Sequence, residues 1–253
     1  MVPRNQSRLI REVPLSDRSA SASFFAEQFD EDGWIDVLIP GDVHRALMAA
    51  GRIDDPFYDR NEEQCRWVED REWWYRLSFD GPREPLGPDE RLRLIFHGLD
   101  TFTTIWLNGE ELGSHQNMFR EAVFDVGEHV RPGERNTLAL LFERPLDHAD
   151  EGAPYQWGRN PERVGMRKAQ FGFGWDWGPR LPTIGIWRPV ELRREHRAAI
   201  RGVHFYTLEI EHHEGKAAVA VRVEAERFAA DGPLTASITL ADAKRSDERS
   251  VAE

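Results

Sequence analysis

The sequence contains one cysteine, very few lysines and no long apolar run. The single cysteine, Cys65, excludes a disulfide framework within the chain, and no recognisable base stands near it, so we interpret it as structural. Only three of the 33 basic residues are lysines, a skew toward arginine that we attribute to coding bias. No segment approaches the length of a membrane span, so no membrane partner is expected.

The amino-terminal stretch lacks the apolar run of about seven residues that a secretory leader carries. A chain that truly starts at this methionine is therefore expected to be cytoplasmic.

The chain also has an excess of negative charge, because it contains 45 acidic and 33 basic residues and its formal net charge is −12. Such a chain repels a phosphate backbone overall, so nucleic acid is not an expected partner. Neither a metal-ligand cluster nor a phosphate-binding glycine motif stands out, and we expect no metal and no cofactor. His44 has no second ligand at a convincing spacing, which favours a packed or capping role.

Hydrophobic residues make up 40% of the chain and charged residues 31%, as in a soluble globular protein. Nine tryptophans indicate either a heavily aromatic core or a carbohydrate-type surface, and composition does not separate the two.

The distribution of turn residues along the chain is typical of an all-β protein. A helix is expected from Asp42 to Gly51, and Asn108-Gly109 predicts a tight hairpin. Short runs rich in branched and aromatic residues, separated by turn residues, predict strands at 9–13 (an edge strand), 67–79, 91–97, 102–107, 122–126, 137–143 and 187–193. Because no helices alternate with these strands, the pattern predicts a β-sandwich of the jelly-roll type.

The residue composition of the chain changes after Leu192, and we place a domain boundary near Glu195. Three further strands are expected at 203–210, 217–225 and 234–240. Three strands do not close a sandwich, so the domains are 1–195 and an unfinished 196–253.

The most unusual stretch is RVGMRKAQFGFGWDWGPR, residues 163–180, which combines glycines, aromatics and one carboxylate. In a regular strand Phe171, Phe173, Trp175 and Trp177 would share one face, but the glycines indicate an irregular, shaped loop. The aromatics could plug the end of a sandwich core. A plug, however, does not require Asp176 between two indoles, and we favour contact with a ligand.

Five stretches of the sequence are distinctive motifs: IPGDVHRAL (39–47), IDDPFYDRNE (53–62), FHGLDTFTTIWLNG (96–109), NMFREAVFDV (117–126) and RKAQFGFGWDWGPRLPTIGIWRPVEL (167–192). In these motifs and their order, the chain resembles the amino-terminal part of a β-mannosidase of glycoside hydrolase family 2. The resemblance implies a galactose-binding-like jelly roll, then an immunoglobulin-like sandwich, incomplete here, and then a (β/α)8 barrel that this sequence lacks.

By the same resemblance, Trp175 and Asp176 bind the terminal mannose of a β-mannoside or manno-oligosaccharide, in a pocket shared with the barrel. Trp177 and Arg167 are candidates for support, Arg167 as a charge partner for a carboxylate, and Lys168 either orients or covers the loop. The resemblance implies retaining hydrolysis by two glutamates of the barrel. No catalytic residue is therefore assigned in this chain, and the fragment alone is expected to be inactive.

Three alternatives remain open. The chain could belong to another family 2 glycosidase, of the β-galactosidase or β-glucuronidase type. It could be a stand-alone carbohydrate-binding module without hydrolysis, or a purely structural interaction domain. Titration with mannose or mannobiose discriminates among them.

Overall fold

The computed structural model describes residues 8–14, 23–26, 32–149, 161–229, 232–241 and 248–251. Its contacts divide the chain into two units, Met1–Gly87 with Arg91–Glu195, and Pro88–Glu90 with His196–Glu253. The domain assignment itself, with 196–253 as the start of an immunoglobulin-like sandwich, stays a prediction.

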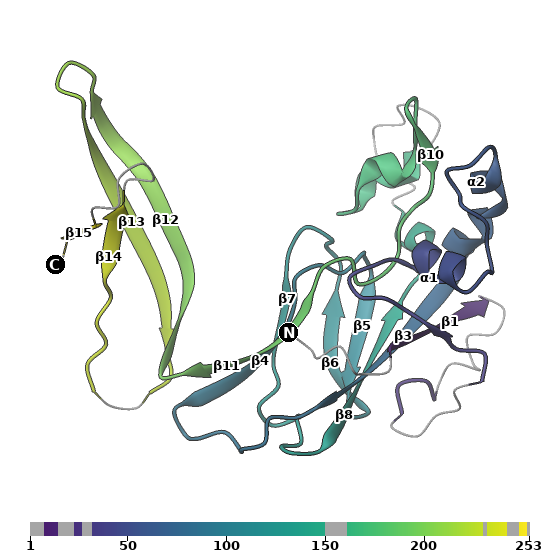
Figure 1. Cartoon of the computed structure of the whole chain (residues 1–253), viewed down its shortest axis with the longest axis horizontal. Helices are drawn as coiled ribbons and strands as arrows, with labels where there is room; N and C mark the ends of the chain where they lie inside the picture. The colour runs from purple at the N-terminus through teal and green to yellow at the C-terminus, as the bar shows by residue number, and fades with distance from the viewer. Residues whose placement is uncertain are drawn as a thin grey trace. The chain divides into compact units, whose positions relative to one another are not determined.

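The first unit is a β-sandwich, seen in Figure 1 as two groups of strands. Its larger sheet has the order β2-β1-β3-β8-β5-β6 and is antiparallel throughout. The strands of this sheet are β1 (Arg8–Pro14), β2 (Ile35–Asp36), β3 (Arg71–Asp80), β5 (Thr103–Leu107), β6 (Glu110–His115) and β8 (Arg135–Phe142). The smaller sheet has the order β11-β4-β7, formed by β4 (Glu90–Phe96), β7 (Ala122–Asp125) and β11 (Val190–His196). The prediction of an all-β, jelly-roll type of sandwich is confirmed.

The main core lies between the two sheets. Tyr75 and Leu77 on β3 pack with Leu94 and Phe96 on β4, in one cluster of buried side chains. The period of two along β3 sends Trp74 to the other face, where it packs with Phe24 and Ala139. The central strand β3 is therefore buried on both faces, which explains why its sequence reads as a nearly continuous aromatic and apolar run.

Two local predictions are confirmed by the backbone. Asn108 and Gly109 have φ values of 53° and 86°, as a two-residue hairpin turn between β5 and β6 requires. The helix α1 (Val43–Ala49) is capped by Asp42, whose carboxylate accepts the Arg45 N–H at 3.2 Å. His44, on this helix, is buried, as expected of a packed side chain.

Three strand predictions of the first unit need correction. The strand predicted at 187–193 lies at Val190–His196. The strand at 9–13 is not an edge strand, because the two-residue β2 pairs with Leu9 and Ile10 on its outer side. The strand predicted from Trp67 begins only at Arg71. A 3-10 helix, η2 (Arg66–Asp70), precedes it and is held by the Trp73 indole, which donates to the Val68 carbonyl at 3.0 Å. Aromatic content alone did not separate this turn from the strand.

One end of the sandwich carries the remaining short elements of the first unit. They are α2 (Asn61–Gln64), η3 (Pro145–His148), η4 (Pro161–Gly165), η5 (Gln170–Gly172), β9 (Phe173–Trp175) and β10 (Gly178–Arg180). Figure 1 shows β10 beside α2, and the two elements are in contact. The segment 163–180 thus packs against α2 at this end of the sandwich.

The described residues of the second unit form two antiparallel strand pairs. The long strands β12 (Ala198–Glu211) and β13 (Lys216–Arg227) form one pair, and β14 (Ile238–Ala241) and β15 (Glu248–Val251) form the other. Most described side chains of β12 and β13 are exposed. The last of the three predicted strands begins at Ile238 rather than at Leu234.

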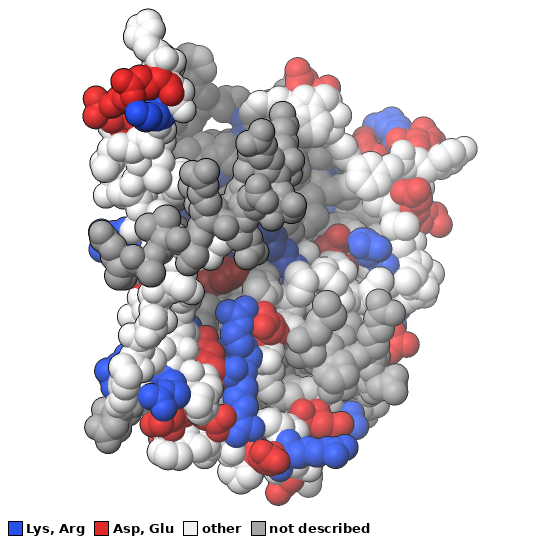
Figure 2. All heavy atoms as spheres, turned by 60° about the vertical axis from the view of Figure 1, so that its left-hand side comes forward, with Lys and Arg blue, Asp and Glu red and all other residues white. Residues whose placement is uncertain are grey.

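Acidic and basic side chains lie interspersed on the face of the molecule that Figure 2 shows. Neither sign forms a continuous field there, although the chain carries a net charge of −12.

Candidate functional site

The segment 163–180 folds into a tight hairpin. Strands β9 and β10 pair antiparallel with Trp175 opposite Gly178, so Asp176 and Trp177 form a two-residue turn at the tip. Gly174 has φ of +98°, a conformation that residues with a Cβ avoid. Gly174 thus has the shaping role that the sequence indicated, and the turn places Asp176 at the tip of the hairpin.

The aromatic side chains of this hairpin have two different roles. Phe173 is fully buried, in a cluster with Phe102 and Met166, and plugs the base of the hairpin. Trp175 is 46% exposed and Trp177 is 70% exposed. The plug interpretation therefore describes Phe173, while the two indoles that flank Asp176 remain open to solvent.

An open cavity of about 570 Å³, here called the Trp175 cavity, lies against the hairpin. It is lined by Arg66, Arg163, Phe173, Gly174, Trp175, Asp176 and Arg180. Trp175 and Asp176, the two predicted binding residues, therefore share one cavity. A cavity of this size accommodates a sugar ring.

Two of the arginines in the Trp175 cavity are held in place by contacts with neighbouring residues. The Arg163 guanidinium lies 4.6 Å from the centre of the Trp175 ring and donates to the Gly174 carbonyl at 3.4 Å. Arg180 donates to Glu69 at 2.8 Å and lies over Phe173. The stacked cation covers one face of Trp175 and restricts the rotation of its indole.

The Asp176 carboxylate is exposed, and within the described part of the chain it makes no hydrogen bond and no ion pair. It shares its cavity with the guanidinium groups of Arg66, Arg163 and Arg180. A free carboxylate beside an indole is suited to accept hydrogen bonds from two ligand hydroxyls while the ring covers an apolar sugar face.

A second cavity, of about 250 Å³, lies on the other side of the hairpin and is called here the Trp177 cavity. The helix α1, the loop at Pro56 and Phe57, and the hairpin residues Phe171, Trp177 and Pro179 contribute to it. The rings of Phe171 and Trp177 lie 5.8 Å apart, centre to centre. Trp177, a predicted support residue, therefore lines a different cavity from Trp175 and Asp176.

Arg167, the other predicted support residue, is exposed and lines neither of these cavities. Its backbone pairs with Asn117 and accepts the Met118 N–H at 3.0 Å. The arginine that stacks on the hairpin is Arg163, four residues earlier. The sequence signal that could have identified it is its place at the start of the aromatic segment, although spacing alone does not rank the two arginines.

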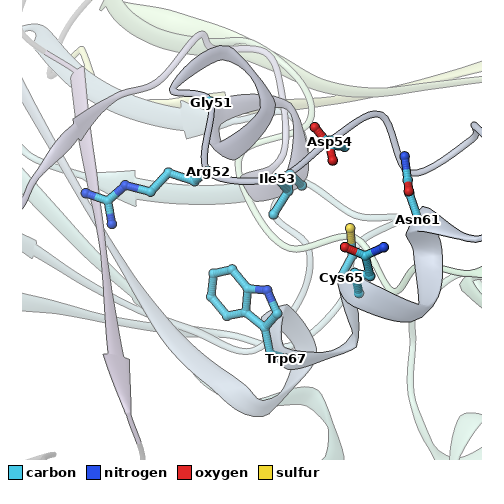
Figure 3. A pocket seen from close by; sticks show the side chains of 8 residues that line it. Gly51, Arg52, Ile53, Asp54, Asn61, Cys65 and Trp67 are labelled. Carbon is cyan, nitrogen blue, oxygen red and sulfur yellow. The ribbon is translucent and has the colours of Figure 1, made fainter.

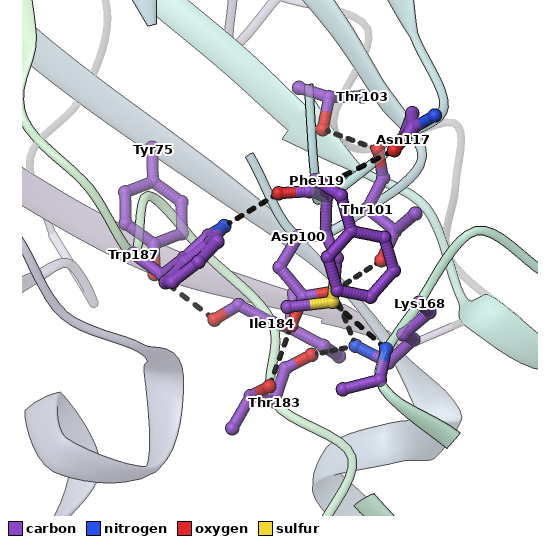
Figure 4. A network of polar contacts seen from close by, with 12 residues as sticks. Tyr75, Asp100, Thr101, Thr103, Asn117, Phe119, Lys168, Thr183, Ile184 and Trp187 are labelled. Atoms are coloured by element: carbon purple, nitrogen blue, oxygen red, sulfur yellow. Dashed lines mark hydrogen bonds and ion pairs between the residues drawn. The ribbon is translucent and has the colours of Figure 1, made fainter. Parts of the chain in front are cut away.

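A buried polar cluster lies beneath the hairpin (Figure 4). Lys168 Nζ and Asp100 Oδ1 are 2.6 Å apart, and both side chains are only 1% exposed. The Thr183 hydroxyl donates to the other Asp100 oxygen at 2.6 Å, and Lys168 also donates to the Thr183 carbonyl. Lys168 was predicted to orient or cover the loop, whereas sequence reasoning missed Asp100 and Thr183.

A third cavity, of about 220 Å³, is lined by residues of 51–67 and is shown in Figure 3. Cys65 contributes to it, and burial, with the negative charges of Asp54 and Glu62, raises the pKa of its thiol. A thiol that resists ionisation is a poor nucleophile, in keeping with a structural cysteine.

In the ranges that the structure describes, no three His, Cys, Asp or Glu side chains are grouped so that they could hold a metal ion. Among the same residues, no helix is both long enough and apolar enough to cross a membrane.

The chain is similar in sequence to proteins named as beta-mannosidases. Over 169 residues it is 38% identical to a beta-mannosidase B of Emericella nidulans, a match that covers 64% of this chain and 20% of the relative. A beta-mannosidase B of Aspergillus terreus is 34% identical over 208 residues, covering 79% of this chain and 24% of the relative. The chain therefore spans about a quarter or less of the length of these relatives.

Solved structures agree with these relatives. The crystal structure of a beta-D-mannosidase from Dictyoglomus thermophilum superimposes with a TM-score of 0.75 at 31% identity, covering 90% of this chain and 26% of that one. An exo-chitosanase of Amycolatopsis orientalis, at 21% identity and a TM-score of 0.65, shares the fold. The model of the family described as glycosyl hydrolase 2 galactose-binding domain-like matches residues 21–188. The chain therefore belongs to this family of galactose-binding-like domains of glycosyl hydrolase 2.

Proposed function

We propose that this chain is the substrate-binding amino-terminal portion of an exo-acting, retaining β-mannosidase. The observation that carries the proposal is the pairing of Trp175, partly exposed, with the exposed Asp176 carboxylate in one cavity. The relatives named as beta-mannosidases support mannose as the sugar. In this proposal Trp175 and Asp176 contact the nonreducing terminal mannose.

The chemistry divides between this chain and the part of the enzyme that lies outside the sequence. Retaining hydrolysis requires two carboxyl groups about 5 Å apart, one as nucleophile and one as acid and base. We assign neither to this chain. Its contribution is to orient the sugar, because hydrogen bonds from two hydroxyls to Asp176 fix the ring in one direction while Trp175 limits its tilt.

Titration of the 253-residue chain with methyl β-D-mannopyranoside tests the binding role. The indole N–H signals of an NMR spectrum report on Trp175 directly, even when affinity is weak. We expect the Trp175 signal to shift on titration and Trp175→Ala to lose binding. Phe57→Ala, which removes another exposed aromatic side chain from outside the Trp175 cavity, serves as the control. Equal binding by the wild type and Trp175→Ala contradicts the proposal.

The same titration with methyl β-galactoside and with a β-glucuronide tests the other family 2 activities. Preference for either sugar over the mannoside replaces the proposed substrate. Hydrolysis of an aryl β-mannoside is expected only from a longer polypeptide that includes a catalytic barrel. Turnover by the 253-residue chain alone contradicts this division of roles.

A further inference from the structure

The buried cluster beneath the hairpin connects two points of the chain that flank it. Lys168 lies five residues before the first residue of β9, and Thr183 lies three residues after the last residue of β10. Asp100 contacts both, through Lys168 Nζ at 2.6 Å and the Thr183 hydroxyl at 2.6 Å. One carboxylate therefore joins the incoming and outgoing ends of the hairpin.

Asp100 itself is fixed to the sandwich. Its backbone N–H and carbonyl exchange two hydrogen bonds of 2.9 Å with Gly185, and the Thr101 hydroxyl donates to its carboxylate. Gly185 has φ of +144°, and a Cβ at this position would overlap the Tyr75 hydroxyl. Tyr75 belongs to the buried central strand β3. Asp100 is therefore connected to this strand through Gly185.

The incoming end has a second connection through Met118. The N–H of Ala169 donates to Met118 Sδ at 2.9 Å, and the Met118 carbonyl accepts the Trp187 indole N–H at 3.2 Å (Figure 4). The direction of the chain at residues 167–169 is thus set by side chains from both before and after the hairpin.

We propose that Asp100, with Lys168 and Thr183, is the positioning device of the sugar-binding hairpin. These three residues fix the positions of both ends of the hairpin, so that Trp175 and Asp176 lie together in the Trp175 cavity. Asp100 and Lys168 touch no sugar and act only through the hairpin. The inference rests on the proposed function, because that function gives the hairpin its ligand.

A structural role and a positioning role differ in what a neutral replacement does. Lys168→Met alone leaves the Asp100 charge buried without its cation, which destabilises the fold. Asp100→Asn with Lys168→Met removes both charges at similar volume and restores much of that stability. The double variant does not restore the directed bonds from Lys168 to Asp100 and Thr183. Stability is therefore expected to recover without recovery of hairpin order.

The test compares the double variant with Asn136→Ala. Asn136 is buried and hydrogen-bonds to Asn108, Arg131 and Glu134, and among the residues that the structure describes none of its hydrogen-bond partners lies in the hairpin, so its loss weakens the fold elsewhere. Amide hydrogen exchange of Leu181 reports hairpin order without any ligand, since its N–H donates to Gly172 at 2.8 Å. Affinity for methyl β-D-mannopyranoside and thermal unfolding are measured on the same samples.

In the double variant we expect Leu181 exchange to be faster on the order of tenfold, relative to Asn136→Ala at matched stability. Mannoside affinity is expected to fall about tenfold, although the double variant unfolds at a higher temperature than Lys168→Met. Exchange and affinity equal to those of Asn136→Ala overturn the inference. If the wild-type chain binds no mannoside, the proposed function fails for it, and Leu181 exchange alone decides whether the cluster positions the hairpin.

Discussion

Replacing Asp176 by Asn separates binding from folding. The side chain is exposed and makes no hydrogen bond or ion pair within the described residues, so its loss changes the free energy of unfolding by less than about 0.5 kcal/mol. A hydrogen bond to a charged group contributes about 1.5–3 kcal/mol. Asparagine keeps one acceptor but loses the charge and the second acceptor. Affinity for a mannoside is therefore expected to fall about ten- to 150-fold.

Calorimetry or NMR titration with methyl β-D-mannopyranoside measures the affinity, and thermal unfolding measures the stability. Asp36→Asn is the matched control, because Asp36 is also exposed, lies on β2 and does not line the Trp175 cavity. The reasoning is refuted if Asp176→Asn binds as the wild type does. Equal losses in both variants refute it as well, since the effect would then come from net charge.

Three further outcomes test the fold. Gly185→Ala forces a Cβ into the Tyr75 hydroxyl at a φ of +144°, and we expect destabilisation of about 3 kcal/mol or more, with an unchanged melting temperature contradicting this packing. Hydrogen bonds from Arg193 lower the pKa of Glu191 from 4.5 to about 2 in the folded chain, so Glu191 contributes stability above about pH 4.5 that is lost as the pH falls toward 2. The melting temperature of Glu191→Gln should consequently vary less with pH across this window, and an identical profile argues against the pair. Limited proteolysis is expected to cleave within 196–253 before the first unit, because the strands there are exposed; resistance of that whole segment would show the expectation to be wrong.

The sandwich was predictable because its signals are local. Asn108-Gly109 satisfies the turn by its own backbone preference, and Asp42 caps α1 with an acceptor three residues from the N–H it binds. The prediction failed at Trp67, where an aromatic residue belongs to η2 instead of β3. There the deciding contact is a hydrogen bond from Trp73 to a backbone carbonyl, which apolar periodicity does not encode.

The site was predictable in its residue types but not in its arrangement. The Trp175-Asp176 pair stands out in the sequence because a carboxylate between indoles has no simple structural use. The hairpin was not predicted, because Asp-Trp is not a turn dipeptide with a strong preference and the residue with the unusual backbone, Gly174, lies two positions before Asp176. Trp175 and Trp177, two positions apart, line different cavities, since Trp175 ends β9 whereas Trp177 belongs to the turn.

Asp100 was missed for a physical reason that also bears on its role. It lies 68 residues from Lys168 in the chain, so no local pattern links the two. A buried ion pair gains little stability over apolar side chains of the same volume, because the cost of desolvating both charges offsets their attraction. Stability alone therefore gives a weak account of a carboxylate and an ammonium group that are both 1% exposed. Their hydrogen bonds are directional where apolar contacts are not, and they end on the two residues that flank the hairpin. Fixing the direction of Trp175 and Asp176 is a use that requires this chemistry.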